Sequence, residues 1–371
     1  MTPAPPNTGF LARRDLDKLR QQLVTQGYRC IGPQLRDGAI VYDELQSVAE
    51  LPVGIHIRQA PGSYQASETD SPRAFAWANG PQSLKPLLFA PRETLWQVEH
   101  GADGTLRFMP APPQAQPTAV IGVRSCDLAA LALQDRHFLA PDCDDPYYRA
   151  RRDALLLVAV NCTHPADTCF CASTGDGPVA DSGYDLLLDE LDDGFLVRAG
   201  SPAGEQLFAS LPVSTATDAQ HEAAACAARA AAEQQQRRLP PGNLYPRMLE
   251  RHDHPRWQDV AGRCLACGNC TSVCPSCFCY REQDHTTLAG DVSGHQREWD
   301  SCFSAGHSYI HNLTIHADTR SRYRQWLLHK LGSWHEQYGR SGCVGCGRCI
   351  AWCPTGIDLT AEITALLEED S

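Results

Sequence analysis

The chain lacks the long apolar segments and the excess of positive charge that whole classes of protein require. Its longest strongly apolar run, residues 154–160, is far too short to cross a bilayer, which takes about 20 residues of helix. No apolar stretch follows the proline-rich residues 1–10, so we expect no secretory signal. With 32 basic and 44 acidic residues, the formal charge of −12 argues against nucleic acid as a partner. We therefore expect a cytoplasmic protein that has no membrane span.

Several motifs of well-known catalytic sites are also missing. No G-x-G-x-x-G follows a strand pattern and no Walker A loop is present, so neither kind of nucleotide site is visible. The chain also has no G-x-S-x-G elbow and no H-E-x-x-H pair. The sequence thus shows no catalytic centre of its own of these kinds.

Cysteine, by contrast, is abundant, with 18 in 371 residues. Eight of them form two copies of the pattern C-x2-C-x2-C-x3-C-P, which is typical of paired [4Fe–4S] clusters. In such pairs three closely spaced thiolates bind one cluster, and the cysteine before proline binds the other. The pattern predicts cluster 1 on Cys264, Cys267, Cys270 and Cys353, and cluster 2 on Cys343, Cys346, Cys349 and Cys274. Zinc and a disulfide framework are the alternatives, although the cytoplasm keeps thiols reduced.

Other cysteines lie outside these motifs. Four follow predicted strand ends, where open α/β sheets place their ligand sites: Cys126, Cys162, Cys169 and Cys171. They could hold a third iron–sulfur cluster, or they could be small buried hydrophobes, as free cysteine often is. Cys277, Cys279 and Cys302 could line the cavity of cluster 1 or form an accessory site. We interpret Cys30, Cys143 and Cys226 as structural.

Periodicity predicts an α+β fold, with a mixed α/β domain over residues 1–239 and an all-helical two-cluster domain over residues 240–371. In the first domain, apolar runs at 119–123 and 154–160 predict buried strands, and Asp127 is a candidate cap for a helix over 128–133. We further expect helices at 15–26 and 218–238, hairpins at 29–45 and 184–199, and an irregular segment at 60–91. Pro240-Pro241-Gly242 marks the boundary. Beyond it, helices are expected at 315–331 and 359–367, and the 68 residues between Cys274 and Cys343 should form a helical insert.

Blocks of sequence around the cysteines resemble the beta subunit of cytosolic NiFe (sulf)hydrogenases, a family that also includes an electron-transfer subunit of anaerobic sulfite reductase. The similar blocks are residues 274–279 (CPSCFC), 299–302 (WDSC), 322–325 (RYRQ), 328–330 (LHK) and 342–349 (GCVGCGRC). Residues 122–130 (GVRSCDLAA), 161–163 (NCT) and 168–171 (TCFC) are similar to the N-terminal blocks of the family. Ser125 stands where the family usually has proline, which affects none of the expected ligands.

The resemblance implies a helical ferredoxin as the second domain and an electron relay as the function. It implies two kinds of partner, namely a subunit that binds flavin and NAD(P) and the subunits that hold a NiFe centre. Nothing in this chain resembles the paired C-x2-C motifs with histidine that hold NiFe, so hydrogen chemistry is expected to lie elsewhere. Two other functions stay open: electron transfer to an anaerobic sulfite reductase, and a flavin- or substrate-binding oxidoreductase in its own right. A structural zinc scaffold is a third.

Overall fold

The first part of the chain is built on a mixed sheet of seven strands, in the order β1-β11-β10-β9-β8-β2-β3. The computed structural model describes residues 8–368. The strands are β1 Thr8–Ala12, β2 Arg29–Arg36, β3 Ala39–Glu44, β8 Thr118–Val123, β9 Leu155–Val160, β10 Leu186–Glu190 and β11 Gly194–Ala199. The central strands β2, β8, β9 and β10 are parallel to one another. At one edge β11 pairs antiparallel with β10, and β1 pairs antiparallel with β11; at the other edge β3 pairs antiparallel with β2. The mixed α/β fold predicted for this part of the chain is confirmed.

Helices cover both faces of this sheet, which explains why its central strands are apolar throughout. On β9, Leu156 and Val158 join one core cluster, which also contains the leucines of α1 Leu16–Thr25 and Leu207 of α6 Pro202–Ala209. Leu157 and Ala159 point to the other face, against α3 Ser125–Phe138 and α4 Pro146–Asp153. Strands buried on both faces read as continuous apolar runs, so β8 and β9 could be predicted from sequence.

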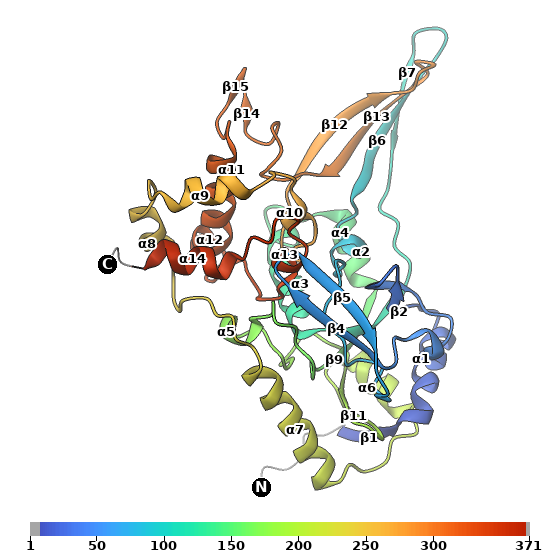
Figure 1. The fold of residues 1–371 in the computed structure, drawn as a ribbon. Helices are drawn as coiled ribbons and strands as arrows, with labels where there is room; N and C mark the ends of the chain where they lie inside the picture. Colours follow the sequence, from blue (N-terminus) through green and yellow to red (C-terminus); the bar gives the residue numbers. More distant parts are fainter. Residues whose placement is uncertain (1–7, 369–371) are drawn as a thin grey trace.

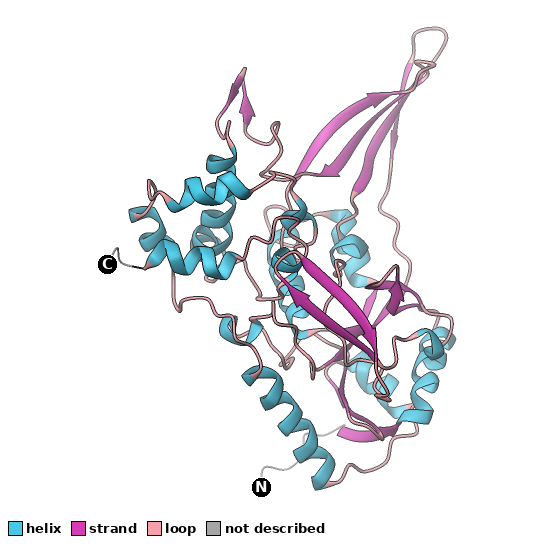
Figure 2. Ribbon diagram, viewed as in Figure 1, coloured by secondary structure: helices cyan, strands magenta, loops and turns pink. Residues whose placement is uncertain are grey.

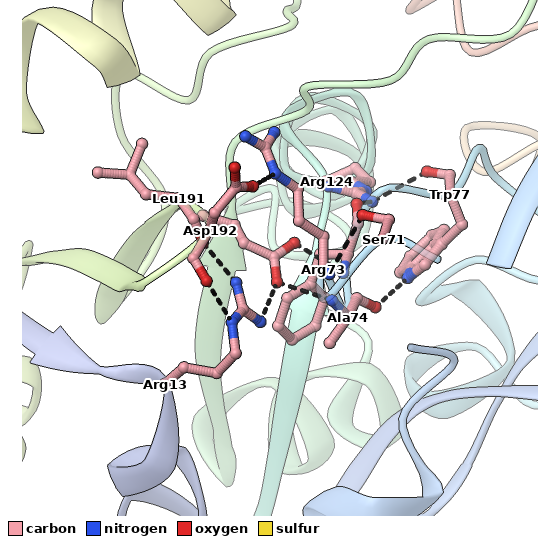
Figure 3. A network of polar contacts seen from close by, with 10 residues as sticks. Arg13, Ser71, Arg73, Ala74, Trp77, Arg124, Leu191 and Asp192 are labelled. Atoms are coloured by element: carbon pink, nitrogen blue, oxygen red, sulfur yellow. Dashed lines mark hydrogen bonds and ion pairs between the residues drawn. The ribbon is translucent and has the colours of Figure 1, made fainter. Parts of the chain in front are cut away.

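A buried carboxylate ties the irregular segment after β5 to one end of the sheet. Glu190, at the end of β10, accepts hydrogen bonds from the backbone amides of Ala74 and Phe75, and its carboxylate binds Arg13. Next to it, Arg124 donates to the carbonyl oxygens of Phe75 and Trp77 (Figure 3). Residues 73–77 are therefore fixed against the sheet although they form no regular element.

Some local predictions for this part need correction. The segment expected to be irregular at 60–91 contains β5 Ser63–Glu68, which pairs with β4 Ile55–Ala60, and the short helix α2 Lys85–Leu88. The cap position of α3 belongs to Arg124, while Asp127 lies in the first turn, where its carboxylate binds an arginine from the far end of the chain. The helix predicted over 218–238 ends earlier, as α7 Asp218–Glu233. The remaining short elements are η1 Arg13–Asp15, η2 Val48–Glu50 and α5 Cys171–Thr174.

The prediction of an all-helical second domain is wrong, because strands lie between its helices (Figure 2). Its helical elements are α8 Tyr245–Glu250, α9 Arg256–Arg263, α10 Asn269–Ser272, α11 Thr319–Leu328, the π-helical η3 His329–Ser333, α12 Trp334–Tyr338, α13 Arg348–Ala351 and α14 Leu359–Leu367. Its strands are β12 Tyr280–Thr286, β13 Val292–Trp299, β14 Tyr309–Ile310 and β15 Leu313–Thr314. Strand β12 is exposed along its whole length, so it carries no apolar pattern that could have indicated it.

Strands from both parts of the chain form one four-stranded sheet, β12-β13-β6-β7, with β6 Arg92–His100 and β7 Leu106–Pro110. It forms an arm that projects from the rest of the molecule (Figure 1). The domain ranges 1–239 and 240–371 remain a prediction. Residues 1–7 of the first range and 369–371 of the second lie outside the described residues. Among residues 8–368, no helix is both long and apolar enough to cross a membrane.

Candidate iron–sulfur centres

The first cysteine motif wraps a cavity beside α10. Cys264 follows α9, Cys267 lies in the loop, Cys270 lies on α10, and all three line a cavity that is partly open to solvent. Cys353, from the second motif, lines the same cavity. The tight loop depends on left-handed backbone at Ala266 (φ 52°) and Gly268 (φ 73°). The structure therefore brings together the four cysteines predicted for cluster 1.

Backbone and side-chain donors also face this cavity. The amide of Ala266 donates to Cys264 Sγ at 3.4 Å, and the amide of Ile357 donates to Cys353 Sγ at 3.3 Å. The hydroxyl of Tyr323 and the indole nitrogen of Trp326 are buried, and neither has a hydrogen-bond partner among residues 8–368. Both residues line the cavity. Burial raises the pKa of Tyr323 well above its usual value, so the hydroxyl keeps its proton and can donate.

These features fit a [4Fe–4S] cluster in the first cavity. Buried donors without a partner are costly unless an acceptor occupies the space they face. A cluster supplies such acceptors through its sulfurs, and four soft thiolates are its usual ligands. Within residues 8–368, no three Cys, His, Asp or Glu side chains lie close enough to share a single metal ion. The thiols are instead spread around a volume that is larger than one ion.

The second motif forms a neighbouring thiol group, which Cys274 joins from the first. Burial is the main cause that raises the pKa of Cys343 to about 12 and the pKa values of Cys346 and Cys349 as well. Nearby thiols raise all three further, and Cys274 is among them in each case. Such thiols lose their protons only when a metal displaces them, which couples binding of a cluster to release of protons.

The two thiol groups lie next to one another. Cys349 lines the first cavity although it belongs to the second motif, and Cys270 acts electrostatically on Cys349. Only Thr271, Ser272 and Val273 separate Cys270, on α10, from Cys274. The aromatic and aliphatic core around Trp257, Tyr323 and Trp326 encloses members of both groups.

The loop of the second motif packs against the cysteines of the N-terminal domain. The amide of Phe170 donates to the carbonyl of Gly345 at 2.8 Å, and Cys169 Sγ lies 3.9 Å from the carbonyl oxygen of Cys346. Cys126 and Cys171 share an apolar cluster with Cys346. The N-terminal cysteines therefore lie beside the second group, as extra members of one thiol-rich region.

The four cysteines of the predicted third site come from three places in the chain. Cys126 lies on α3, Cys162 follows β9, and Cys169 and Cys171 lie just before and at the first residue of α5. Burial is the main cause of the raised pKa of Cys169, and Cys171 and Cys162 raise it further. Side-chain amides donate to two of the sulfurs, Asn79 Nδ2 to Cys126 at 3.2 Å and Gln235 Nε2 to Cys171 at 3.4 Å. Hydrogen bonds of this kind are common around cluster thiolates, so the arrangement is compatible with a third cluster.

The structure adds functional residues that spacing alone did not indicate. Besides Tyr323 and Trp326, two buried lysines, Lys85 and Lys330, lie near Cys274 and Cys277. Arg348, between two motif cysteines, is fully buried against Asp127. Lys330 and Tyr323 belong to sequence blocks on which the family resemblance rests, and that resemblance is the one signal that could have drawn attention to them.

Comparison with known proteins agrees with this geometry. Residues 263–357 match a family described as a 4Fe-4S dicluster domain. The chain is 29% identical over 283 residues to sulfhydrogenase 2 subunit beta of Pyrococcus furiosus, which covers 74% of this chain and 79% of that protein. No solved structure matches the chain significantly. The predicted resemblance and the two [4Fe–4S] clusters are thereby confirmed, and the individual ligands stay predictions.

Proposed function

We propose that this chain, an iron–sulfur protein related to a sulfhydrogenase beta subunit, relays electrons within a NiFe hydrogenase complex. Electrons would pass between a subunit that binds flavin and NAD(P) and the subunits that hold the NiFe centre. The observation that carries the proposal is the adjacency of two thiol groups joined through α10. A cytoplasmic location belongs to the same proposal, since the cysteines must stay reduced to bind clusters.

In this proposal the eight motif cysteines act as ligands and take no part in acid–base chemistry. Cys264, Cys267, Cys270 and Cys353 would hold cluster 1, and Cys343, Cys346, Cys349 and Cys274 would hold cluster 2. When bound, each cluster supplies a site that takes up and releases electrons, at a potential set by its surroundings. The protein contributes the rest, because it fixes the two sites beside each other.

The N-terminal cysteines would extend this path. If Cys126, Cys162, Cys169 and Cys171 hold a third cluster, it lies beside the loop of cluster 2, where Cys169 already contacts Cys346. Electrons could then leave or enter through the α/β domain as well as through the side of cluster 1. The amide groups of Asn79 and Gln235 support this assignment, since each donates to one of the four sulfurs.

The experiment that tests the relay compares the isolated chain with its complex. The pure, iron-loaded chain should accept electrons from dithionite but should neither oxidise NAD(P)H nor take up hydrogen. Purified by a tag from its native host, it should bring down two kinds of partner, one that binds flavin and one that contains nickel. NAD(P)H oxidation by the pure chain, with flavin among the released cofactors, would instead make it an oxidoreductase in its own right. Recovery with a sulfite-reducing partner would assign it to the alternative complex.

A further inference from the structure

A group of thiols outside the two motifs is brought together by the arm of the molecule. Cys277 and Cys279 lie between α10 and β12, and Cys302 lies just after β13. Because β12 pairs with β13 with Tyr280 opposite Trp299, the chain returns to the same place after the hairpin. The amide of Asp300 then donates to the carbonyl of Cys279 at 2.9 Å. A hairpin of polar strands therefore fixes three cysteines that are distant in sequence.

Two of these thiols border a pocket that adjoins the cavity of cluster 1 and shares Cys267 and Gly268 with it. Cys277 and Cys279 line a hollow of about 550 Å³, together with Asp300 and Lys85. Cys302 is buried behind them, and Cys279 and Asp300 both act electrostatically on its thiol. Soft thiolates, which are the usual ligands of iron–sulfur clusters, thus face a space that a carboxylate also borders.

Two buried lysines beside this group have no carboxylate partner among residues 8–368. Lys85 Nζ donates to the carbonyl oxygens of Thr271 and Ser272 and lies 4.0 Å from the centre of the Trp299 ring. Lys330 Nζ donates to Ser276 Oγ at 3.1 Å and lies 4.7 Å from the ring of Trp334. Burying a cation without a nearby anion is costly, so two such cations indicate that negative charge belongs beside them.

Cluster 2 accounts for only part of that charge. Burial is the largest influence on the pKa of both lysines and lowers it. Of the nearby thiols, Cys274, one of the ligands proposed for cluster 2, raises the pKa of Lys330 most, whereas Cys277, which belongs to neither motif, raises the pKa of Lys85 most. Lys85 and Cys277 line the same pocket. The charge that balances Lys85 is therefore expected on the side of Cys277 and the pocket.

We propose that Cys277, Cys279 and Cys302 bind a further iron–sulfur cluster through their thiolates, with its fourth position facing the pocket beside Asp300. Among residues 8–368, no three such donors converge on the position of a single ion. The same is true of the eight motif cysteines, which surround the clusters of a dicluster domain. Its three proposed ligands belong to neither motif, although its pocket shares Cys267 with cluster 1, so loss of this site and loss of cluster 1 are told apart by their separate EPR signals.

The test removes two of the ligands and counts iron. In a Cys279→Ser/Cys302→Ser double variant, reconstituted anaerobically beside the parent chain, we expect about four fewer irons per chain. The EPR signals of the two motif clusters should be unchanged. A Cys143→Ser/Cys226→Ser variant is the control, since both of those cysteines are exposed. Equal iron in parent and double variant, zinc lost in place of iron, or loss of a motif-cluster signal would each overturn the proposal.

A second measurement uses the unmodified chain, so it does not depend on how the variant folds. The iron-loaded protein is treated with iodoacetamide, before and after a chelator removes the iron, and modified cysteines are located by mass spectrometry. We expect Cys279, which is only partly buried, to react at least tenfold faster once iron is removed. Cys143 and Cys226 should react in both states. Equal labelling of Cys279 before and after chelation would contradict the site.

Discussion

Tyr323 and Trp326 place two unpaired donors beside the thiols proposed for cluster 1. Hydrogen bonds to cluster sulfurs stabilise the reduced, more negative state and so raise the reduction potential. Tyr323→Phe removes only the hydroxyl, and we expect the midpoint potential of cluster 1 to fall by roughly 50 mV. A shift of 59 mV corresponds to a tenfold change in a one-electron equilibrium. The measurement is an EPR-monitored redox titration of the isolated chain.

The matched control is Tyr309→Phe, which removes an exposed hydroxyl that binds Asn312 far from the cavity. This variant should leave the midpoint potentials of both clusters unchanged. If Tyr323→Phe leaves the potential of cluster 1 unchanged while the cluster is fully loaded, the hydroxyl does not donate to it.

A variant of Cys353 tests whether the cysteine before proline in the second motif binds the cluster of the first. It lines the cavity of Cys264, Cys267 and Cys270 although its motif neighbours belong to the second group. Cys353→Ser should therefore perturb the EPR signal of cluster 1 and leave that of cluster 2. Cys346→Ser is the comparison, and it should do the reverse. Should both variants disturb the same signal, each motif binds its own cluster.

At this scale the sequence predicted the cysteines but not the side chains that act on them. A fixed spacing identifies ligands because three thiols must reach one cluster from a single turn of chain. Tyr323 and Trp326 reach the cavity from α11, about 50 residues after the first motif, and Lys85 arrives from the other end of the chain. No local pattern records such contacts, since they arise only when distant elements pack together.

Among the elements, the loop of the second motif and the start of α5 pack closely through a glycine. Gly345 has a φ of 64°, and a Cβ placed on it would lie 2.5 Å from the backbone of Cys171. Gly345→Ala therefore combines left-handed strain with a backbone clash. We expect a loss of about 2–4 kcal/mol of stability and a marked loss of iron from cluster 2. Thermal denaturation and iron analysis of the reconstituted chain measure both.

Gly262→Ala is the matched control, because Gly262 lies in α9 with no atom near the added Cβ. Alanine is the better helix former, so this variant should be neutral or slightly more stable. If Gly345→Ala retains full iron and the parent melting temperature, the two loops are not locked together as the structure indicates.

The strands show which elements could be predicted. Strand β9 was expected because its buried apolar run is bounded by polar residues, and the hairpin of β10 and β11 because a turn sequence separates two apolar segments. Strand β12 has neither signal, and its hydrogen bonds come from β13, which in turn pairs with β6 about 190 residues earlier. Pairing over such a distance leaves no periodicity, so residues after the first motif were wrongly expected to be helical.

At the scale of the whole molecule, the two parts of the chain are joined by specific polar contacts as well as by the arm. Lys85 reaches the carbonyl oxygens of α10, and Gln134 of α3 donates to the carbonyl of Pro275 at 2.8 Å. Arg340 binds Asp176 through two hydrogen bonds. Both thiol groups therefore lie close to where the α/β sheet domain meets the helices, which couples the retention of iron to the association of the two parts.

The Arg348–Asp127 ion pair is the most deeply buried of these contacts. Both side chains are 1% exposed, and the guanidinium binds the carboxylate through two bonds of 2.7 and 2.8 Å. Arg348 Nε also donates to the carbonyl of Gly80. Because Arg348 stands between Cys346 and Cys349, this pair attaches the loop of the second motif to α3.

Asp127→Asn leaves the arginine buried without its counter-charge, which costs about 3–5 kcal/mol in comparable pairs. We expect a lower denaturation midpoint for the iron-loaded chain and faster loss of iron from cluster 2 than from cluster 1. The control is Asp144→Asn, which breaks the half-exposed pair with Arg149 and should cost less than about 1 kcal/mol. An Asp127→Leu/Arg348→Met double variant removes both charges and should recover much of the stability. If that variant is stable yet loses iron from cluster 2, the pair orients the ligand loop. If it is stable and keeps its iron, the pair acts only through the energy of its own buried charges.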